Sequence, residues 1–348
     1  MNDSFWRGRR VFLTGHTGFK GSWLALWLSR MGAEVTGYAL PAAEVSLFRQ
    51  ARIEGLLTHV HGDVRDLPAL GKAIAAANPE VVFHLAAQPL VRLSYDTPVE
   101  TFATNVQGTV HVLEACRRVK SLRSVVCITS DKCYENREWV WPYRESDPMG
   151  GHDPYSASKG AAELVISAYR SSFLHGDTKV ASVRAGNVIG GGDWAADRLI
   201  PDIVRALAGG QSPLIRSPDS IRPWQHVLEA LSGYLMIAQR LAEGADWAAS
   251  GWNFGPSEDD ARAVDWMVDR MISTWGSGSW TAADGPRPHE ANILKLDCSR
   301  ARTELGWRPV LGLEGALDWI VQWHKAVAAG DDARVVTLAQ LDQYRARL

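Results

Sequence analysis

Short apolar runs alternate with helix-like segments along the first half of the chain. The runs 10–14, 34–40, 59–62, 81–87, 125–129 and 180–184 are rich in β-branched residues and lack polar alternation. Such runs are typical of strands that are buried on both faces of a parallel sheet. Between them, residues 20–31, 98–119 and 155–173 repeat apolar positions at helical spacing, and Trp23, Trp27 and Met31 fall on one face. The pattern predicts an α/β fold, a doubly wound parallel sheet of the Rossmann type.

The second half of the chain has a different sequence pattern. After Gly190, turn-rich segments such as GGGDW, GGQSP and GPSEDD separate modest helical patterns. We therefore predict a dinucleotide-binding Rossmann domain over residues 1–189 and a smaller, mainly substrate-binding lobe over 190–348. Residues 251–256 are expected to return to the large sheet, and the chain from Leu305 onward to close with an amphipathic helix.

The composition argues against several classes of protein. The 37 Lys and Arg against 39 Asp and Glu give a net charge of −2, which disfavours a nucleic-acid partner held by bulk charge. We see no apolar run of the roughly 18 residues that a spanning helix needs, and no signal peptide at the N-terminus, so no membrane partner is expected. The four cysteines lack CxxC spacing, so we expect free thiols, no metal site and a cytoplasmic protein.

A glycine-rich segment, GHTGFKG at 15–21, follows the first predicted strand and opens the first predicted helix. In that context glycines allow positive φ and close backbone approach to a pyrophosphate, whose charge the free N–H groups and the helix dipole attract. A tight turn without a ligand is the alternative. The motif predicts dinucleotide binding by Gly15, Thr17, Gly18, Phe19 and Gly21.

Two further strand ends can complete the dinucleotide site. Asp63, followed by Val64, ends the third predicted strand, where its carboxylate can either accept from the adenine amino group or cap the next helix. The acidic residue that usually binds the ribose 2′-hydroxyl is missing, because GYAL stands at 37–40. This motif therefore does not distinguish NAD from NADP as the cofactor. Small residues at the end of the fourth strand would let a flat cofactor approach the backbone of Leu85, Ala86, Ala87 and Gln88.

A candidate catalytic set lies at the next strand end and helix. Tyr155 and Lys159 stand four residues apart at the start of a predicted helix, so both side chains leave from one face. A tyrosine with its ordinary pKa of about 10 is no base at neutral pH, but a neighbouring ammonium lowers that pKa. Ser130 ends an apolar strand, where doubly wound sheets place their ligands, and can hydrogen-bond the hydroxyl that Tyr155 deprotonates. Asp131 and Lys132 follow directly, either in this site or as a solvated loop pair.

These motifs together resemble an extended short-chain dehydrogenase/reductase. The resemblance is carried along nearly the whole chain by TGHTGFKG, HLAAQ, Asn105 in TNVQGT, Ser130, Tyr155 with Lys159, RPWQHV at 222–227 and LGWRP at 305–309. Within that family, TSDKCYEN, GGHDPYSASKGAAEL and GNVIGGGDWAADRLIPD are most similar to the CDP-glucose 4,6-dehydratases. The resemblance implies a hydro-lyase with NAD as its cofactor and a nucleotide sugar, CDP-glucose, as its substrate.

The implied reaction suggests catalytic roles for the ionisable residues that follow Ser130. Oxidation at C4 makes the C5 hydrogen acidic, water leaves from C6, and the stored hydride returns to C6. Such a cycle needs an acid and a base in addition to Tyr155. We assign Asp131 as the acid for the departing hydroxyl and Lys132 as the C5 base or as support of the enolate. Glu135 is the alternative base. Asn105 is implied to support the water and tyrosine geometry of the cofactor site.

The resemblance also implies a diphosphate-binding set, made of Asn187, Arg198, Arg222 and Arg287, for which surface salt bridges are the alternative. Trp194 and Trp224 could stack on a base or sugar or pack in the core. The helices at 98–119 and 155–173 are implied to pair across a two-fold axis, as a homodimer or homotetramer. A 4-epimerase, another nucleotide-sugar dehydratase or a non-catalytic dinucleotide sensor are the competing functions.

Overall fold

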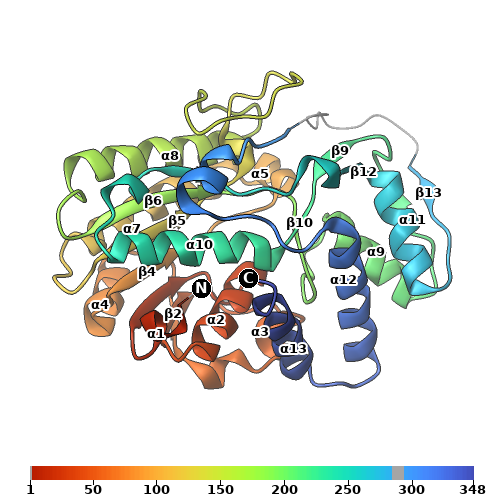
Figure 1. The fold of residues 1–348 in the computed structure, drawn as a ribbon, viewed down its shortest axis with the longest axis horizontal. Coiled ribbons are helices and arrows are strands. Elements are labelled where there is room, and N and C mark those ends of the chain that lie inside the picture. Colours follow the sequence, from red (N-terminus) through yellow and green to blue (C-terminus); the bar gives the residue numbers. More distant parts are fainter. Residues whose placement is uncertain (1, 284–293) are drawn as a thin grey trace.

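A seven-stranded parallel sheet forms the centre of the computed structural model, which describes residues 2–283 and 294–348 (Figure 1). Its order is β11-β6-β5-β4-β1-β2-β3. The strands are β1 (Arg10–Thr14), β2 (Glu34–Ala39), β3 (Thr58–His61), β4 (Val81–His84), β5 (Ser124–Ile128), β6 (Lys179–Arg184) and β11 (Gly251–Asn253). The predicted doubly wound parallel sheet is confirmed, and β11 lies at its edge, parallel to β6.

Helices cover both faces of the sheet (Figure 1). One face carries α2 (Phe19–Arg30) and α10 (Val227–Ala242), and the other α4 (Leu67–Ala77), α7 (Gly108–Cys116) and α8 (Pro154–Ser172). Successive strand residues alternate between these layers, so that Val126 packs with the first and Val125 with the second. Because both layers are apolar, the strands need no polar positions, which explains their continuous apolar runs.

The helix predicted over 98–119 is interrupted in its middle. It consists of α6 (Pro98–Phe102), a π-helical segment (Ala103–Gln107) and α7, with helical backbone angles throughout. Such π segments are frequent at functional sites because they reorient one side chain. Here the segment carries Asn105, whose contacts are described with the site.

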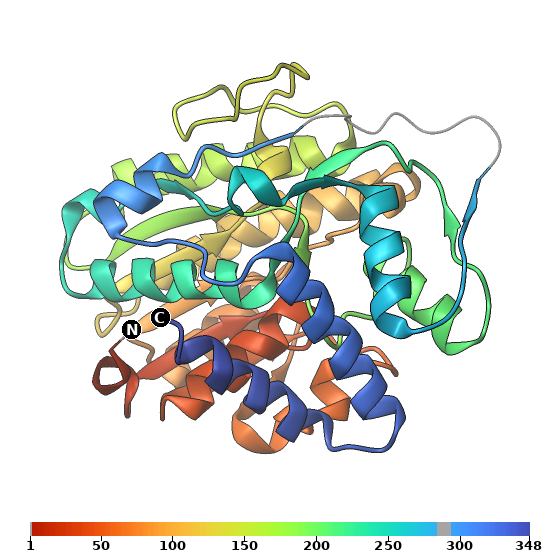
Figure 2. The same cartoon turned by 45° about the vertical axis from the view of Figure 1, so that its right-hand side comes forward.

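The chain beyond residue 190 contributes to two places. A separate apolar cluster beside the sheet is built from α9 (Leu199–Ala208), α11 (Val264–Trp275) and α12 (Leu313–Ala328), and Figure 2 shows α9 and α11 standing away from the sheet. The short strand pairs of this region are β7 (Val188–Ile189) with β10 (Gln225–His226), β8 (Leu214–Ile215) with β13 (Thr281–Ala282), and β9 (Ile221–Pro223) with β12 (Ala261–Ala263). The border at 189/190 stays a prediction.

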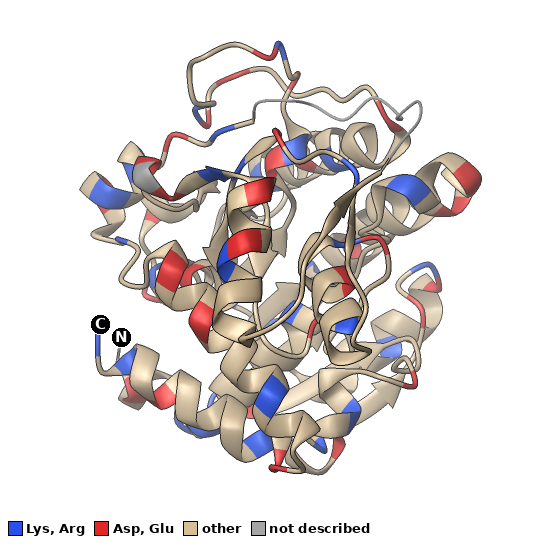
Figure 3. Cartoon of the chain, turned by 90° about the vertical axis from the view of Figure 1, so that its right-hand side faces the viewer, with Lys and Arg blue, Asp and Glu red and all other residues tan. Residues whose placement is uncertain are grey.

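The C-terminal part ends in two helices where one was expected. After α12, the chain turns at Gly330 and forms α13 (Ala333–Arg345), which packs on α2 with Tyr344 against Trp27. Three short helices complete the list: α1 (Asp3–Trp6), α3 (Leu47–Gln50) and α5 (Val91–Asp96). Figure 3 shows acidic and basic residues interspersed over one side of the molecule. Among the described residues, no helix combines the length and apolar character needed to cross a membrane.

One buried ion pair ties α8 to two strand ends. Glu163 of α8 accepts from the guanidinium of Arg184 at the end of β6 at 2.7 Å, and the two side chains are only 4% and 6% exposed. The same carboxylate accepts from the hydroxyls of Thr129, just after β5, at 2.5 Å and of Ser182 at 2.7 Å. These bonds satisfy the buried charge and hold α8 in register with β5 and β6.

We expect Glu163→Gln to lower the free energy of unfolding by about 3–5 kcal/mol, because it leaves Arg184 buried without its counter-charge. The control is Glu243→Gln, which removes the exposed partner of Arg240 and should cost less than about 1 kcal/mol. Urea unfolding of the two variants and the wild type measures both values. Equal losses in the two variants would contradict the role given to the buried pair.

Candidate active site

A cavity of about 530 Å³ lies where the sheet strands end. Residues that follow β1, β2, β3, β4, β5 and β6 form one wall, and residues of the segments 197–202 and 214–222 form the opposite wall. Ligands of doubly wound sheets bind at the carboxyl ends of the strands, so the cavity has the position expected of a binding site.

The phosphate loop forms the floor of the cavity at the start of α2. Gly18 caps the helix without a side-chain hydrogen bond, and the first turn contains no acidic residue, so its N–H groups remain available to an anion. Gly15 has φ +74°, and a Cβ at Gly21 would lie 2.2 Å from the oxygen of Gly15. This backbone fits a dinucleotide pyrophosphate. The predicted residues that line the cavity here are Gly15, Thr17, Gly18, Phe19 and Gly21.

The next two strand ends form the far end of the cavity. Asp63 borders it with Val64, and α4 is capped instead by Asp66, which accepts from the N–H of Ala69 at 3.0 Å. The carboxylate of Asp63 accepts from the guanidinium of Arg65 at 2.6 Å, which lowers the pKa of Asp63. After β2, Ala39 and Leu40 line the cavity in place of an acidic residue, so the choice between NAD and NADP is not settled there.

Two predicted cofactor residues, Gln88 and Asn105, lie behind the cavity wall, and their contact with a cofactor stays a prediction. Leu85, Ala86 and Ala87 line the cavity, but Gln88 and Asn105 are not among the residues of its wall. The side chain of Asn105 accepts from the N–H of Gln88 at 2.8 Å and donates to its carbonyl at 3.0 Å and to the hydroxyl of Ser158 at 2.8 Å. These two residues therefore brace the end of β4 against α8 behind the wall.

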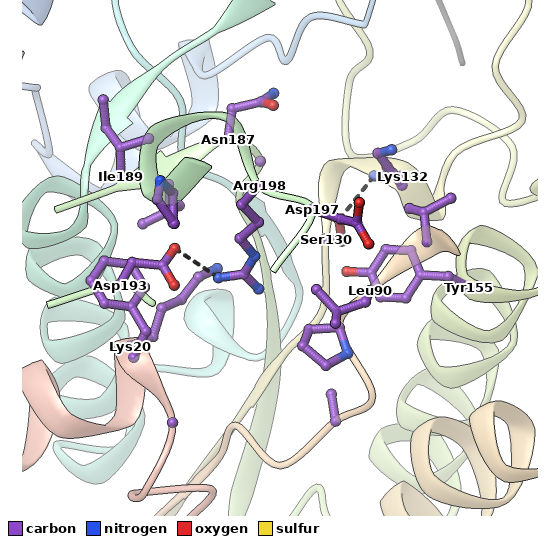
Figure 4. Close-up of a pocket in the computed structure, with 18 of the residues that line it drawn as sticks. Lys20, Leu90, Ser130, Lys132, Tyr155, Asn187, Ile189, Asp193, Asp197 and Arg198 are labelled. Carbon is purple, nitrogen blue, oxygen red and sulfur yellow. Dashed lines mark hydrogen bonds and ion pairs between the residues drawn. The ribbon is translucent and has the colours of Figure 1, made fainter. Parts of the chain in front are cut away.

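The predicted catalytic residues meet at the end of β5. Ser130 donates to a carboxylate oxygen of Asp131 at 2.9 Å, and Figure 4 shows the hydroxyl of Tyr155 directed toward Ser130. Burial raises the pKa of Tyr155 to about 12, while the hydrogen bond from Ser130 lowers it. Lys159 donates to the carbonyl of Ile128 at 3.4 Å, and burial lowers its pKa to about 8. The expected activation of the tyrosine by the lysine is thus outweighed by burial.

Asp131 lines this cavity, and one of its carboxylate oxygens is buried from solvent. That oxygen, Oδ2, has no hydrogen-bond partner among the described residues. It packs against Gly186, since a Cβ there would lie 1.7 Å from it. A buried carboxylate oxygen without a partner is costly.

The two candidate C5 bases have different surroundings. Lys132 lines the cavity. Glu135 does not; its side chain is 51% exposed and pairs with Arg137 at 3.2 Å. Of the two, therefore, only Lys132 borders the space where a substrate can bind.

Asn187 lines the cavity after β6, and Arg198 and Arg222 line it on the opposite wall, whereas Arg287 lies outside the described residues. Trp224 also lines it. Trp194 does not: its indole donates to Gln50 at 2.9 Å and its ring packs against the main core.

Lys20 and Asp193 are among the charged residues of the cavity that the sequence interpretation missed. Both stood inside motifs that were read for their glycines, GFKG and GGGDW. The position of Lys20 in the sequence could have indicated its role. A cation in the first turn of a helix opposes the helix dipole and is unfavourable unless an anion binds beside it.

The chain is similar to known nucleotide-sugar enzymes. A model of the family described as GDP-mannose 4,6 dehydratase matches residues 12–318. The CDP-glucose 4,6-dehydratase of Salmonella typhimurium is 57% identical over 99% of this chain and 98% of its own. Among solved structures, the dTDP-glucose 4,6-dehydratase DesIV of Streptomyces venezuelae, with NAD and TYD bound, has a TM-score of 0.80 at 23% identity and covers 93% of this chain and 99% of its own. MoeE5 in complex with UDP-glucose and NAD has a TM-score of 0.78 at 26% identity, with coverage of 91% and 99%.

We expect Gly21→Ala to weaken NAD binding at least about tenfold, because the added Cβ would force the phosphate loop away from α2. Gly71→Ala is the matched control, since Gly71 lies in α4 with no atom within 4 Å of an added Cβ. Titration of each protein with NAD, followed by tryptophan fluorescence, gives the dissociation constants. The expectation fails if Gly21→Ala binds NAD as tightly as Gly71→Ala.

Proposed function

The chain belongs to the NAD-dependent epimerase and dehydratase family of extended short-chain dehydrogenases/reductases, and from this premise we propose that it dehydrates CDP-D-glucose to CDP-4-dehydro-6-deoxy-D-glucose. The observation that carries the choice of reaction is the buried carboxyl group of Asp131, which lines the cavity beside Ser130 and Tyr155. A 4-epimerase needs no acid for a departing hydroxyl, and a dehydratase does. The choice of CDP rests on the 57% identity to the Salmonella enzyme.

NAD is the cofactor of this family, and solved relatives hold it. In this chain the phosphate loop 15–21 would hold its pyrophosphate, the end of β3 with Asp63 its adenosine, and Lys159 its nicotinamide ribose. When bound, NAD accepts a hydride from C4 of the sugar and returns it to C6. The chain's own residues must then supply every proton transfer.

Tyr155 removes the proton of the C4 hydroxyl, with Ser130 hydrogen-bonded to the same oxygen. Since burial raises the pKa of Tyr155 to about 12, the reaction needs positive charge near the phenolate. Lys159, one helical turn along α8, supplies it when its ammonium turns from the Ile128 carbonyl toward the cavity.

Asp131 donates a proton to O6 as that hydroxyl leaves. Lys132 takes the C5 proton or stabilises the enolate that forms when the proton departs. Once the double bond between C5 and C6 has accepted the hydride at C6, the proton taken from C5 returns to C5. The C4 hydroxyl proton held by Tyr155 replaces, by exchange with solvent, the proton that Asp131 gave to O6. The sugar thus loses one water, and the residues and the cofactor return to their starting forms.

We also propose a homodimer or homotetramer. Val99 of α6 and Leu164 of α8 are 75% and 64% exposed, and the neighbouring Phe102 and Phe173 are exposed too, so both helices carry apolar surface that a second copy would cover. The mass of the protein in solution tests this, and a stable monomer would contradict it.

The purified protein with NAD should convert CDP-glucose, with a kcat/KM well above those for UDP-, dTDP- and GDP-glucose. The product should have lost one water and should show the ultraviolet absorbance of a 4-keto-6-deoxy sugar in alkali. An epimer without loss of water would instead identify a 4-epimerase. NAD binding without turnover of any nucleotide sugar would identify a dinucleotide sensor.

Asp131→Asn should slow loss of water by about 10²-fold or more while C4 oxidation continues, so that reduced cofactor accumulates on addition of CDP-glucose. Tyr155→Phe is the contrasting variant, because it retains the ring and removes the base, and should show neither product nor reduced cofactor. Stopped-flow absorbance of the reduced cofactor distinguishes the two. If turnover of Asp131→Asn falls without accumulation, Asp131 acts before elimination.

Exchange of the C5 hydrogen distinguishes the two candidate C5 bases, Lys132 and Glu135. Exchange of the C5 hydrogen with deuterated solvent should slow in Lys132→Ala and persist in Glu135→Gln, whose carboxylate lies outside the cavity wall. Slowed exchange in the glutamate variant alone would transfer the role of base to Glu135.

A further inference from the structure

The proposed reaction leaves several charged residues of the cavity without a role, Lys20 and Asp193 among them. Lys20, from the first turn of α2, and Asp193, from the turn after β7, both line the cavity. Figure 4 shows the side chain of Lys20 running toward Asp193 and Arg198. The three residues lie between the phosphate loop and the wall that carries the predicted substrate-binding residues.

The chain fixes this cluster from both sides. Trp23, one turn after Lys20 on α2, donates its indole N–H to the carbonyl of Gly191 at 2.9 Å. Phe19 lies so close to Gly190 that a Cβ there would be 3.0 Å from the ring. The loop that carries Asp193 is therefore attached to the helix that carries Lys20, and the glycines of GGGDW allow the close approach.

Of the three charged side chains in this cluster, Asp193 and Arg198 pair with each other and Lys20 has no partner among the described residues. Asp193, with a side chain 5% exposed, accepts from Arg198 at 2.9 Å and from the N–H of Ala195 at 3.2 Å. The ammonium of Lys20 has no hydrogen-bond or ion-pair partner within residues 2–283 and 294–348. Burial, followed by the charges of Arg198 and Lys159, lowers the pKa of Lys20 to about 8. Arg198 is thus paired with Asp193, whereas Lys20 is not.

The position of Lys20 is unfavourable unless an anion binds beside it. A cation in the first turn of a helix opposes the helix dipole, and the partly buried side chain of Lys20 has no partner for its ammonium among the described residues. A bound phosphate would remove both costs. Its oxygens would accept hydrogen bonds from the ammonium and from the free N–H groups of the same turn.

We propose that Lys20 and Arg198, the latter held by Asp193, form a pair of cations that binds a diphosphate at the border between the phosphate loop and the substrate wall. The inference rests on the proposed function, which brings two diphosphates to this cavity. One is the pyrophosphate of the dinucleotide, and the other is the diphosphate of the nucleotide sugar. Lys20 is assigned as the ligand to one or both.

The test measures binding of three probes, NAD, CDP and cytidine, by isothermal titration. Lys20→Met removes the charge and keeps the aliphatic stem, Lys20→Gln repeats the loss with a polar group, and Lys20→Arg restores the charge. Lys72→Met removes an exposed lysine of α4 as the control. Loss of a charge-assisted hydrogen bond corresponds to about 10- to 100-fold weaker binding.

We expect the Met and Gln variants to bind NAD or CDP about 10- to 100-fold more weakly, with the arginine variant within a few-fold of wild type and cytidine unaffected. The ligand that weakens identifies which diphosphate Lys20 binds, and weakening of both identifies a shared contact. Unchanged binding of both diphosphates overturns the proposal. Equal weakening of cytidine also overturns it, because cytidine has no phosphate.

These measurements separate failure of this inference from failure of the proposed function. Binding is measured without turnover, so an inactive wild-type protein whose diphosphate binding depends on Lys20 would contradict only the reaction. An active wild-type enzyme whose binding ignores Lys20 would contradict only the inference. Thermal unfolding of each variant, expected within a few degrees of wild type, shows that the fold is intact.

Discussion

The geometry of the reacting groups depends on the buried ion pair of Glu163 and Arg184. Glu163 lies on α8, one turn beyond Lys159 and two beyond Tyr155, and it accepts from Thr129, the residue before Ser130. Arg184 extends the network, because it donates to the hydroxyl of Tyr134 at 2.6 Å, and that hydroxyl donates to Asn253 of β11 at 2.7 Å. The network therefore joins the base on the helix, the serine on the strand end and the segment that carries the acid. Misplacement by about 1 Å can cost as much as 10²-fold in rate, so a rigid buried connection is a condition of the chemistry.

Burial favours the neutral form of three ionisable side chains of the cavity, Tyr155, Lys159 and Lys20. The pKa of Tyr155 is raised, and those of Lys159 and Lys20 are lowered, so the neutral form of each side chain is favoured. A phenolate, an ammonium and a diphosphate in the same cavity stabilise one another, whereas each alone is costly. The charged state that the reaction needs is therefore completed by the bound ligands, which couples binding to activation of the base.

The sequence predicted the parts of this structure that depend on local pattern, and it failed where side chains compete for partners. Strand β1 and helix α8 lie within one residue of their predicted bounds, because continuous apolar runs and helical spacing are local properties. Asn105 and Gln88 were assigned to the cofactor, but each satisfies the other's hydrogen bonds, a pairing 17 residues apart that no spacing rule reveals. Lys159, which was expected to lower the pKa of Tyr155, donates to the carbonyl of Ile128, and its effect on the tyrosine stays a prediction. The second C-terminal helix was missed for a similar reason, because its docking on α2 is a long-range contact between the two ends of the chain.

The turn at residues 190–193 decides how the two walls of the cavity are placed. A Cβ at Gly191 would lie 2.3 Å from the ring of Trp323 on α12, and Gly192 has φ +78° with Leu47 of α3 at its side. This turn thus touches α2, α3 and α12 at once, and the predicted substrate lobe is joined to the Rossmann layers through close backbone contact. A connection of this kind leaves little freedom for the walls to move apart at this point. Selectivity at this border then rests on which charged side chains the fixed walls present, and Lys20, Asp193 and Arg198 are those that the turn and α2 bring together.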